Sequence, residues 1–177
     1  MKHLVDGSPA PLNSTIGPRS RWLVAAAVLS LVYCLALTHQ MGEKSHDDAY
    51  ITYRYAENLA RGGGLSFNRG EPYLATTTPL LTLGLAALDR LAPSVPIPVI
   101  GQWLSGLALW ALCLATYLLL AGDGRPWGGL YVGLLVLCNP WLTSFWGSES
   151  RLLLALVTFS FVAYQRNREG ACGFLAG

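Results

Sequence analysis

Three long segments of this chain contain no charged residue, and they limit the folds open to it. No Asp, Glu, Lys or Arg occurs in residues 22–38, 91–122 or 126–148. A helix that crosses the hydrocarbon core of a bilayer needs about 20 apolar residues. Only 12% of the 177 residues are charged, about half the share that is usual in a soluble domain. The sequence therefore predicts an all-α integral membrane protein.

About four crossings are predicted, and a long outer loop separates the first from the second. Residues 79–91 are apolar but too short to cross, and they end near Asp89 and Arg90, which favours a helix lying at the membrane surface. The first outer loop then covers 39–97 and also holds an amphipathic helix at 47–61. The transmembrane helices are expected at 22–38, 98–121, 126–145 and 149–165.

Basic residues in the short loops set the predicted orientation. Lys and Arg concentrate on the cytoplasmic side of membrane spans, so the N-terminal tail, 1–21, is placed in the cytoplasm. With four crossings the loop at 122–126 and the end at 166–177 are cytoplasmic too, whereas a fifth crossing at 79–91 would put basic loops on opposite sides. The first span could instead be a signal peptide, but no clear small-residue cleavage site follows it. The basic residues concerned are Lys2, Arg19, Arg21, Arg125, Arg166 and Arg168.

Net charge and cysteine content argue against two other kinds of protein. The net charge is +2 and no basic tract occurs, so the sequence predicts no nucleic-acid partner. The four cysteines lie mostly within apolar segments, and no pair has the spacing of metal ligands. We interpret them as apolar packing residues that form no disulfide framework.

Two adjacent acids, Asp47 and Asp48, lie just beyond the first apolar segment. Carboxylates in or at the edge of a bilayer are costly and are often functional. They could act in catalysis, or hold a divalent cation such as Mg²⁺, Mn²⁺ or Ca²⁺ through their oxygens. They could equally complement the dipole of the following helix, since Ser45 and Asp48 have the spacing of a capping box. Spacing alone does not favour a capping role over a catalytic or metal-binding role for the two acids.

The segment that begins with these acids is predicted to be amphipathic. Ile51, Tyr55 and Leu59 recur every four residues and predict one apolar stripe. Glu57 and Arg61 are four residues apart, which is a favourable spacing for an ion pair on a helix. This segment is therefore expected to lie with one face against the protein or the membrane.

Further charged residues on the same outer side extend the candidate site. Glu149 lies at the start of the fourth predicted span, where it either favours the helix dipole or supplies a third acid that could share a metal ion with Asp47 and Asp48. Arg54 and Arg61 could bind a phosphate through paired N–H groups, although single exposed arginines are more often solvated.

Two other polar residues near span ends are expected to have structural roles. His46, beside the acids, could bind a metal, but a lone loop histidine is more often solvated. Arg151 lies near one end of the fourth predicted span, and its long side chain is expected to snorkel to the membrane surface.

The outer-loop residues also carry a family resemblance. Residues 47–60, followed by 63–71, resemble the first outer loop of GT-C glycosyltransferases, and most closely the bacterial branch that includes arabinofuranosyltransferases and protein-mannosyltransferase-like proteins. Residues 76–80 resemble the family's Thr-x-Pro-Leu element, and residues 147–150 resemble its Gly-x-Glu-Thr element.

The resemblance implies an enzyme of the cell membrane that transfers a sugar from a polyprenyl-phosphate donor to a glycan or protein acceptor. It implies that Asp47, with Asp48 as the alternative, is the catalytic base, and that Glu149 is a second acid linked to the acceptor or to a divalent cation such as Mg²⁺ or Mn²⁺. Family members have about ten or more spans, so the chain is expected to be an incomplete piece that is inactive alone.

Two classes other than an enzyme stay open from the residues themselves. A non-enzymatic membrane scaffold or assembly subunit would use the acids only to complement a helix end. A transporter or flippase fragment would use acids to relay ions, but it would place them in the middle of spans, and none of the four predicted spans has a central acid.

Overall fold

The computed structural model describes residues 18–42, 44–71, 76–122, 124–166 and 173–175. It is all-helical, with 76% helix and no strand among these residues, so the predicted helical class is confirmed. The helices are α1 (Pro18–Met41), α2 (Asp47–Ala60), α3 (Pro79–Leu91), α4 (Ile97–Gly122), α5 (Pro126–Leu137), α6 (Pro140–Ser144) and α7 (Ser150–Gln165).

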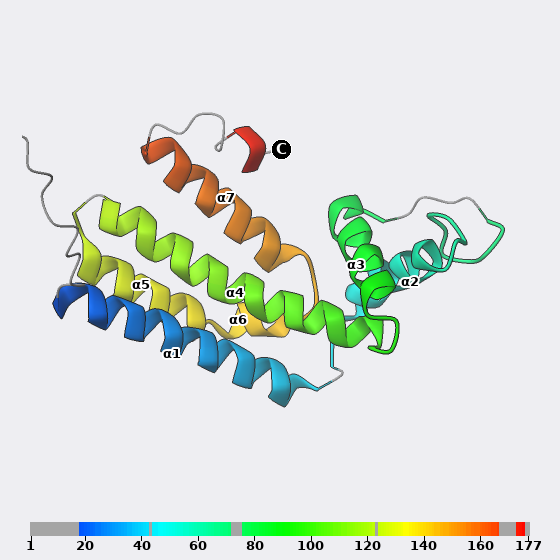
Figure 1. Ribbon diagram of the computed structural model, residues 1–177, viewed down its shortest axis with the longest axis horizontal. Coiled ribbons are helices and arrows are strands. Elements are labelled where there is room, and N and C mark those ends of the chain that lie inside the picture. The colour runs from blue at the N-terminus through cyan, green and yellow to red at the C-terminus, as the bar shows by residue number, and fades with distance from the viewer. Residues whose placement is uncertain (1–17, 43, 72–75, 123, 167–172, 176–177) are drawn as a thin grey trace, which may run out of the picture.

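Helix α4 is the centre of the structure. Helices α1, α5 and α7 lie alongside it, while α2 and α3 lie together at the end where α4 begins (Figure 1). The turn between α4 and α5 lies at the opposite end, and α7 begins at the same end as α2 and α3 (Figure 1). The arrangement therefore brings the segments before α2 and before α7, which are distant in sequence, to one end of the bundle.

Two helices are long and apolar enough to cross a membrane. They are residues 23–41 of α1 and the whole of α4, with 19 and 26 residues. At 1.5 Å per residue, α4 spans about 39 Å, whereas α5 spans about 18 Å, well short of a hydrocarbon core of about 30 Å. Helices α5 and α7 are apolar but shorter. Length and composition thus support two crossings directly, and the count of four stays a prediction.

The third predicted span, 126–145, is not one continuous helix, and this expectation was wrong. Helix α5 ends at Leu137, and α6 begins only at Pro140. Proline has no N–H, and its ring clashes with the carbonyl of the preceding turn, so it stops a helix and suits the first position of the next. The Asn139 side chain caps α6 by accepting from the N–H groups of Trp141 and Leu142 at 2.9 and 3.4 Å.

Small residues let helices approach α4 closely. A Cβ at Gly106 would collide with the Thr38 hydroxyl of α1, and one at Gly129 would lie 2.9 Å from the backbone oxygen of Tyr117. The indole N–H of Trp110 also donates to a backbone oxygen of α1 at 3.0 Å. In membranes, small residues at helix contacts allow this close backbone packing. The bundle is therefore held by shape and a few hydrogen bonds.

The buried face of α2 differs from the predicted stripe. Ile51 is 43% exposed, whereas Ala49, Tyr53 and Ala56 are 2%, 2% and 0% exposed. These three residues share one core with α3 and the start of α4. Of the predicted stripe, Tyr55 is 1% exposed and Leu59 packs against this core, so the four-residue repeat failed at Ile51 alone.

Candidate functional site

The acid pair occupies the first two positions of α2. Asp47 and Asp48 are both exposed, and the residue before them, His46, has extended backbone but no side-chain capping bond. The predicted capping box is therefore not formed. Ser45, its expected first member, turns instead toward Tyr53, whose hydroxyl lies 3.3 Å from the Ser45 oxygen. The two carboxylates face open space at the positive end of a helix dipole.

The segment before α2 lies directly against the segment before α7. The backbone N–H of His46 donates to the carbonyl oxygen of Trp146 at 2.8 Å, and the His46 ring lies 4.8 Å from the ring of Phe145, centroid to centroid. Asp47 directly follows His46, and Glu149 lies three positions after Trp146. The structure thus brings together the two segments that carry the predicted acids.

Tyr53 is the centre of the polar network that joins these segments. Its hydroxyl donates to the carbonyl oxygen of Gly147 at 3.2 Å and contacts Ser45, which also accepts from the amide of Gln102 at 3.3 Å. A side chain at Gly101 or at Gly147 would collide with the Tyr53 ring or hydroxyl. Burial is the main cause that raises the pKa of Tyr53 above its ordinary value of 10.0, so the phenol is neutral and acts as a structural donor.

Arg151 is the residue whose place the sequence predicted wrongly. Its side chain is 0% exposed, so it does not snorkel to a surface. The guanidinium donates through Nε to the carbonyl oxygen of Leu142 at 2.8 Å, through Nη2 to the same oxygen, and through Nη1 to the Ser105 hydroxyl at 2.5 Å. It also lies 4.1 Å from the centre of the Trp146 ring, a favourable cation–π distance. A single charge in the first turn of an otherwise apolar helix was the sequence signal for this.

A metal site was predicted from the acids Asp47, Asp48 and Glu149. Among the described residues, no three or more His, Cys, Asp or Glu side chains lie together closely enough to hold a metal ion. His46 Nδ1 and Asp48 Oδ2 are 3.8 Å apart, which is an ion-pair distance only when the imidazole is protonated. The divalent cation expected at Asp47, Asp48 and Glu149 therefore stays a prediction.

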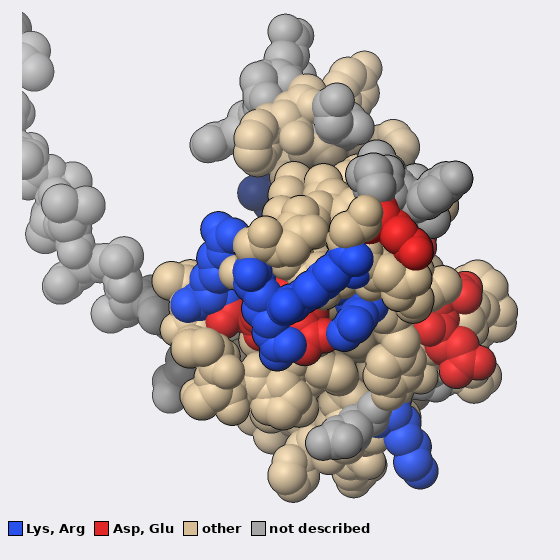
Figure 2. All heavy atoms as spheres, turned by 90° about the vertical axis from the view of Figure 1, so that its right-hand side faces the viewer, with Lys and Arg blue, Asp and Glu red and all other residues tan. Residues whose placement is uncertain are grey.

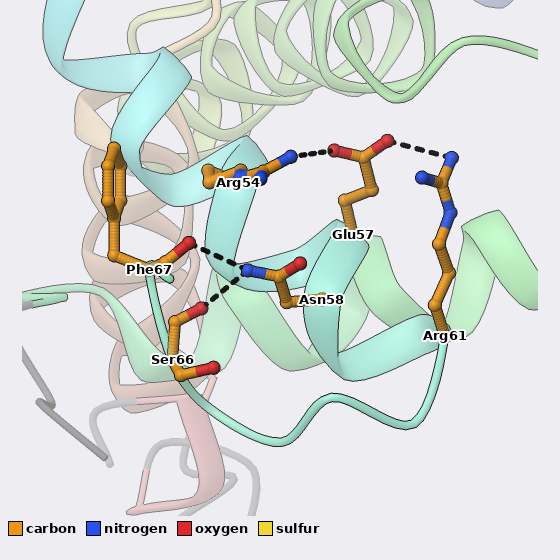
Figure 3. A network of polar contacts seen from close by, with 6 residues as sticks. All are labelled: Arg54, Glu57, Asn58, Arg61, Ser66 and Phe67. Carbon is orange, nitrogen blue, oxygen red and sulfur yellow. Dashed lines mark hydrogen bonds and ion pairs between the residues drawn. The ribbon is translucent and has the colours of Figure 1, made fainter. Parts of the chain in front are cut away.

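Two of the predicted phosphate ligands are paired with one carboxylate. Arg61 contacts Glu57 at 2.7 Å, as the spacing predicted, and Arg54 contacts its other oxygen at 3.3 Å (Figure 3). Arg54 lies about 10 Å along the helix axis from Asp47, and Arg61 about 20 Å from it, at 1.5 Å per residue. A phosphate beside Asp47 could therefore reach Arg54 but not Arg61.

The remaining arginines of this region surround the end of α2. Basic side chains with acids between them gather on the face at the α2 and α3 end of the molecule, turned away from the long helices (Figure 2). Arg90 of α3 donates to the carbonyl oxygens of Ala60 and Leu59 at 3.1 and 3.0 Å, and so satisfies the open end of α2. Asn58, buried in α2, holds the following loop by donating to the carbonyl oxygens of Ser66 and Phe67, both at 2.8 Å (Figure 3).

The Thr-x-Pro-Leu segment packs against the same helix. The hydroxyl of Thr78 lies 3.2 Å from that of Thr52 on α2, and the hydroxyl of Thr76 lies 3.2 Å from that of Thr82 on α3. Thr52 is one turn beyond Asp48. This hydroxyl cluster therefore fixes the first turns of α2 and α3 relative to each other.

Comparisons with known proteins identify no relative. No family model, no curated protein and no solved structure matches the chain.

Proposed function

We propose that the chain crosses the membrane four times, with its N-terminus in the cytoplasm and with α2 and α3 on the outer side. The crossings would be α1, α4, the pair α5–α6, and α7. This proposal is supported by the side-by-side packing of the long helices (Figure 1). It is also supported by Trp127 and Trp141, near the starts of α5 and α6, which are 81% and 63% exposed. Exposed tryptophans near both ends of a crossing suit the two membrane interfaces.

The topology has a direct test in thiol labelling of intact cells. A cysteine placed at exposed Glu71 should react with a reagent that cannot cross the membrane, whereas one placed at exposed Arg125 should react only after permeabilisation. Exposed Cys138 would be changed to Ser beforehand. Equal labelling of the two positions would overturn the four-crossing arrangement.

We propose that the outer end holds part of a glycosyltransferase site that takes its sugar from a polyprenyl-phosphate donor. The observation that carries this proposal is the hydrogen bond from His46 to Trp146, because it joins the two segments whose residues resemble the acid-bearing loops of that family. Asp47 is exposed beside this junction, so an acceptor hydroxyl can reach it. A lipid-linked donor also explains why the acids lie at the end of the spans, where its phosphate would be.

Asp47 would act as the general base in an inverting transfer. Its carboxylate takes the proton from the acceptor hydroxyl while the oxygen attacks the anomeric carbon, and the sugar–phosphate bond breaks. The leaving phosphate requires positive charge, which Arg54 or a divalent cation would supply. Asp48 is the alternative base, and Glu149 would orient the acceptor.

Transfer of a labelled sugar from a polyprenyl phosphate by the complete protein in proteoliposomes tests this proposal. Asp47→Asn should lower the rate by about 10²- to 10⁴-fold, the usual contribution of a general base. Glu71→Gln is the matched control, because Glu71 is an exposed acid of the same loop. Unchanged transfer by both Asp47→Ala and Asp48→Ala would show that neither acid is the base.

A membrane scaffold is the second candidate, and the position of the acids favours it. Asp47 and Asp48 both lie in the first turn of α2, where a carboxylate stabilises the helix dipole without any chemistry. A scaffold predicts that Asp47→Asn costs less than about 1 kcal/mol of stability and leaves function intact. The transfer assay therefore distinguishes the two candidates.

A further inference from the structure

Arg151 is a fully buried cation that the proposed reaction does not use. It lies in the first turn of α7 and is 0% exposed. Among the described residues, its recorded hydrogen-bond and ring partners are neutral, namely a carbonyl oxygen, a hydroxyl and an indole ring. Burying a charge costs several kcal/mol unless good contacts offset it. What those contacts hold in place therefore indicates what the residue does.

The contacts of Arg151 converge on the segment that leads into α7. Nε and Nη2 both donate to the carbonyl oxygen of Leu142, and the guanidinium lies over the ring of Trp146. Nη1 donates to Ser105 of α4, and the same hydroxyl accepts the backbone N–H of Gly147 at 3.1 Å. One side chain thus fixes both ends of residues 142–147 against α4.

The same segment carries the bonds that reach the acid pair. The carbonyl oxygen of Trp146 accepts from His46, and that of Gly147 accepts from Tyr53. A chain of direct contacts therefore runs from Arg151 through this segment to the residue before Asp47. Glu149 lies between Gly147 and Arg151, so it is held from both sides.

We propose that Arg151 is a positioning residue that locks residues 142–149 to α4 and thereby sets the place of Glu149 relative to Asp47. It acts without touching a substrate. Its effect on sugar transfer rests on the proposed function, but its effect on the two segments does not. Lysine would not replace it, because a compact ammonium group lacks the planar fork that lets the guanidinium donate twice to the Leu142 oxygen and once to Ser105.

Hydrogen–deuterium exchange of the full chain in lipid nanodiscs tests the lock directly. In Arg151→Met, the amides of His46 and Gly147 should exchange about tenfold faster. Local opening of the wild-type segment must break the guanidinium contacts, whereas in the variant these contacts are absent and opening costs less free energy. Arg151→Lys should give nearly the same increase. Arg125→Met, at an exposed arginine at the other end of the bundle, is the matched control and should leave both amides unchanged.

A milder variant keeps the test decisive if Arg151→Met fails to fold. Ser105→Ala removes the hydroxyl shared by Arg151 and Gly147 and leaves the guanidinium with its Leu142 and Trp146 contacts. It should accelerate exchange at Gly147 more than at His46. Unchanged exchange of both amides in either variant, or full protection in Arg151→Lys, would overturn the proposal.

The transfer assay separates this inference from the proposed function. If both hold, Arg151→Met should lower kcat about tenfold or more, with a smaller change in KM for the donor, because the donor's own contacts remain. Faster amide exchange in Arg151→Met, together with no sugar transfer by the complete wild-type protein, would support the positioning role of Arg151 and reject the glycosyltransferase. Loss of transfer with unchanged exchange would reject the lock.

Discussion

The hydroxyl of Tyr53 donates to the carbonyl oxygen of Gly147 at 3.2 Å, across 94 positions of the chain. Tyr53 lies on α2, which carries the acid pair, and Gly147 lies two residues before Glu149. The bond is buried and shares its donor oxygen with Ser45. Through it, the segment that leads into α7 depends on the orientation of α2.

Tyr53→Phe should destabilise the protein by about 1–2 kcal/mol, because it leaves a buried carbonyl oxygen without its donor. The free energy of unfolding in detergent micelles, followed by circular dichroism in denaturant, gives the measurement. Tyr131→Phe is the control, since Tyr131 is 64% exposed and should lose less than about 0.5 kcal/mol. Equal losses in the two variants would show that the Tyr53 hydroxyl bond contributes nothing.

The same residue predicts a dependence on alkaline pH. The pKa of Tyr53 is raised above 10.0 in the folded protein, mainly by burial, so the folded state holds this proton more tightly than the unfolded state does. Its contribution to stability is therefore complete below about pH 10 and is lost as the pH rises through the folded pKa. Unfolding measured from pH 8 to 11 should show a steeper decline for wild type than for Tyr53→Phe, and parallel curves would contradict this.

Gly147→Ala should destabilise the protein more than Gly124→Ala, although the two glycines have similar backbone conformations. Gly147 and Gly124 have φ of +87° and +76°, a region that costs an L-residue about 1–2 kcal/mol. A Cβ at Gly124 meets nothing within 4 Å, whereas one at Gly147 lies 2.7 Å from the Ser45 hydroxyl and also meets that of Tyr53. Gly147→Ala should therefore cost about 1–3 kcal/mol more stability than Gly124→Ala. Equal unfolding midpoints of the two variants would show that the Ser45 and Tyr53 side chains move aside without cost.

Asn58→Ala should release the loop that follows α2. The buried amide holds the carbonyl oxygens of Ser66 and Phe67, so its removal leaves two acceptors unpaired at about 1–3 kcal/mol in total. Limited proteolysis should then cut residues 62–71 faster. The control is Asn68→Ala, whose exposed bond to Glu71 carries little energy; similar cutting of both variants would contradict the assigned role of Asn58.

Arg54→Gln and Arg61→Gln should have different effects on donor binding although they share Glu57. Each exposed ion pair contributes less than about 1 kcal/mol to stability, so neither variant should unfold. Only Arg54 is within reach of a phosphate beside Asp47. A raised KM for the polyprenyl-phosphate donor is therefore expected in Arg54→Gln alone, and the same rise in Arg61→Gln would place the phosphate elsewhere.

Most helix bounds could be predicted from the sequence, because charge-free runs and their ends are local features. Helix α3 begins and ends at the predicted residues, 79 and 91, and α4 differs from its prediction by one residue at each end. The break before Pro140 could also have been predicted from the proline itself, but the absence of charge from residues 126–148 suggested one uninterrupted helix.

The contacts of the site could not be predicted, because they depend on how distant segments pack. Spacing suggested a capping box at Ser45, yet its hydroxyl is taken by Tyr53 and Gln102. Arg151 was expected at a surface, and only the burial of Trp146 and Ser105 around it makes an inward position favourable. The side shared by Asp47 and Glu149 was predicted from span counting, and the observed junction of their segments agrees with that expectation without testing their roles.

The bonds from Arg90 to the last carbonyl oxygens of α2 join the end of that helix to α3. One end carries the two carboxylates, and the other is gripped by α3 about 20 Å away. Near the acids, the Thr52 hydroxyl also contacts that of Thr78, directly before α3. The two helices are therefore joined near both ends of α2 and should move as one unit.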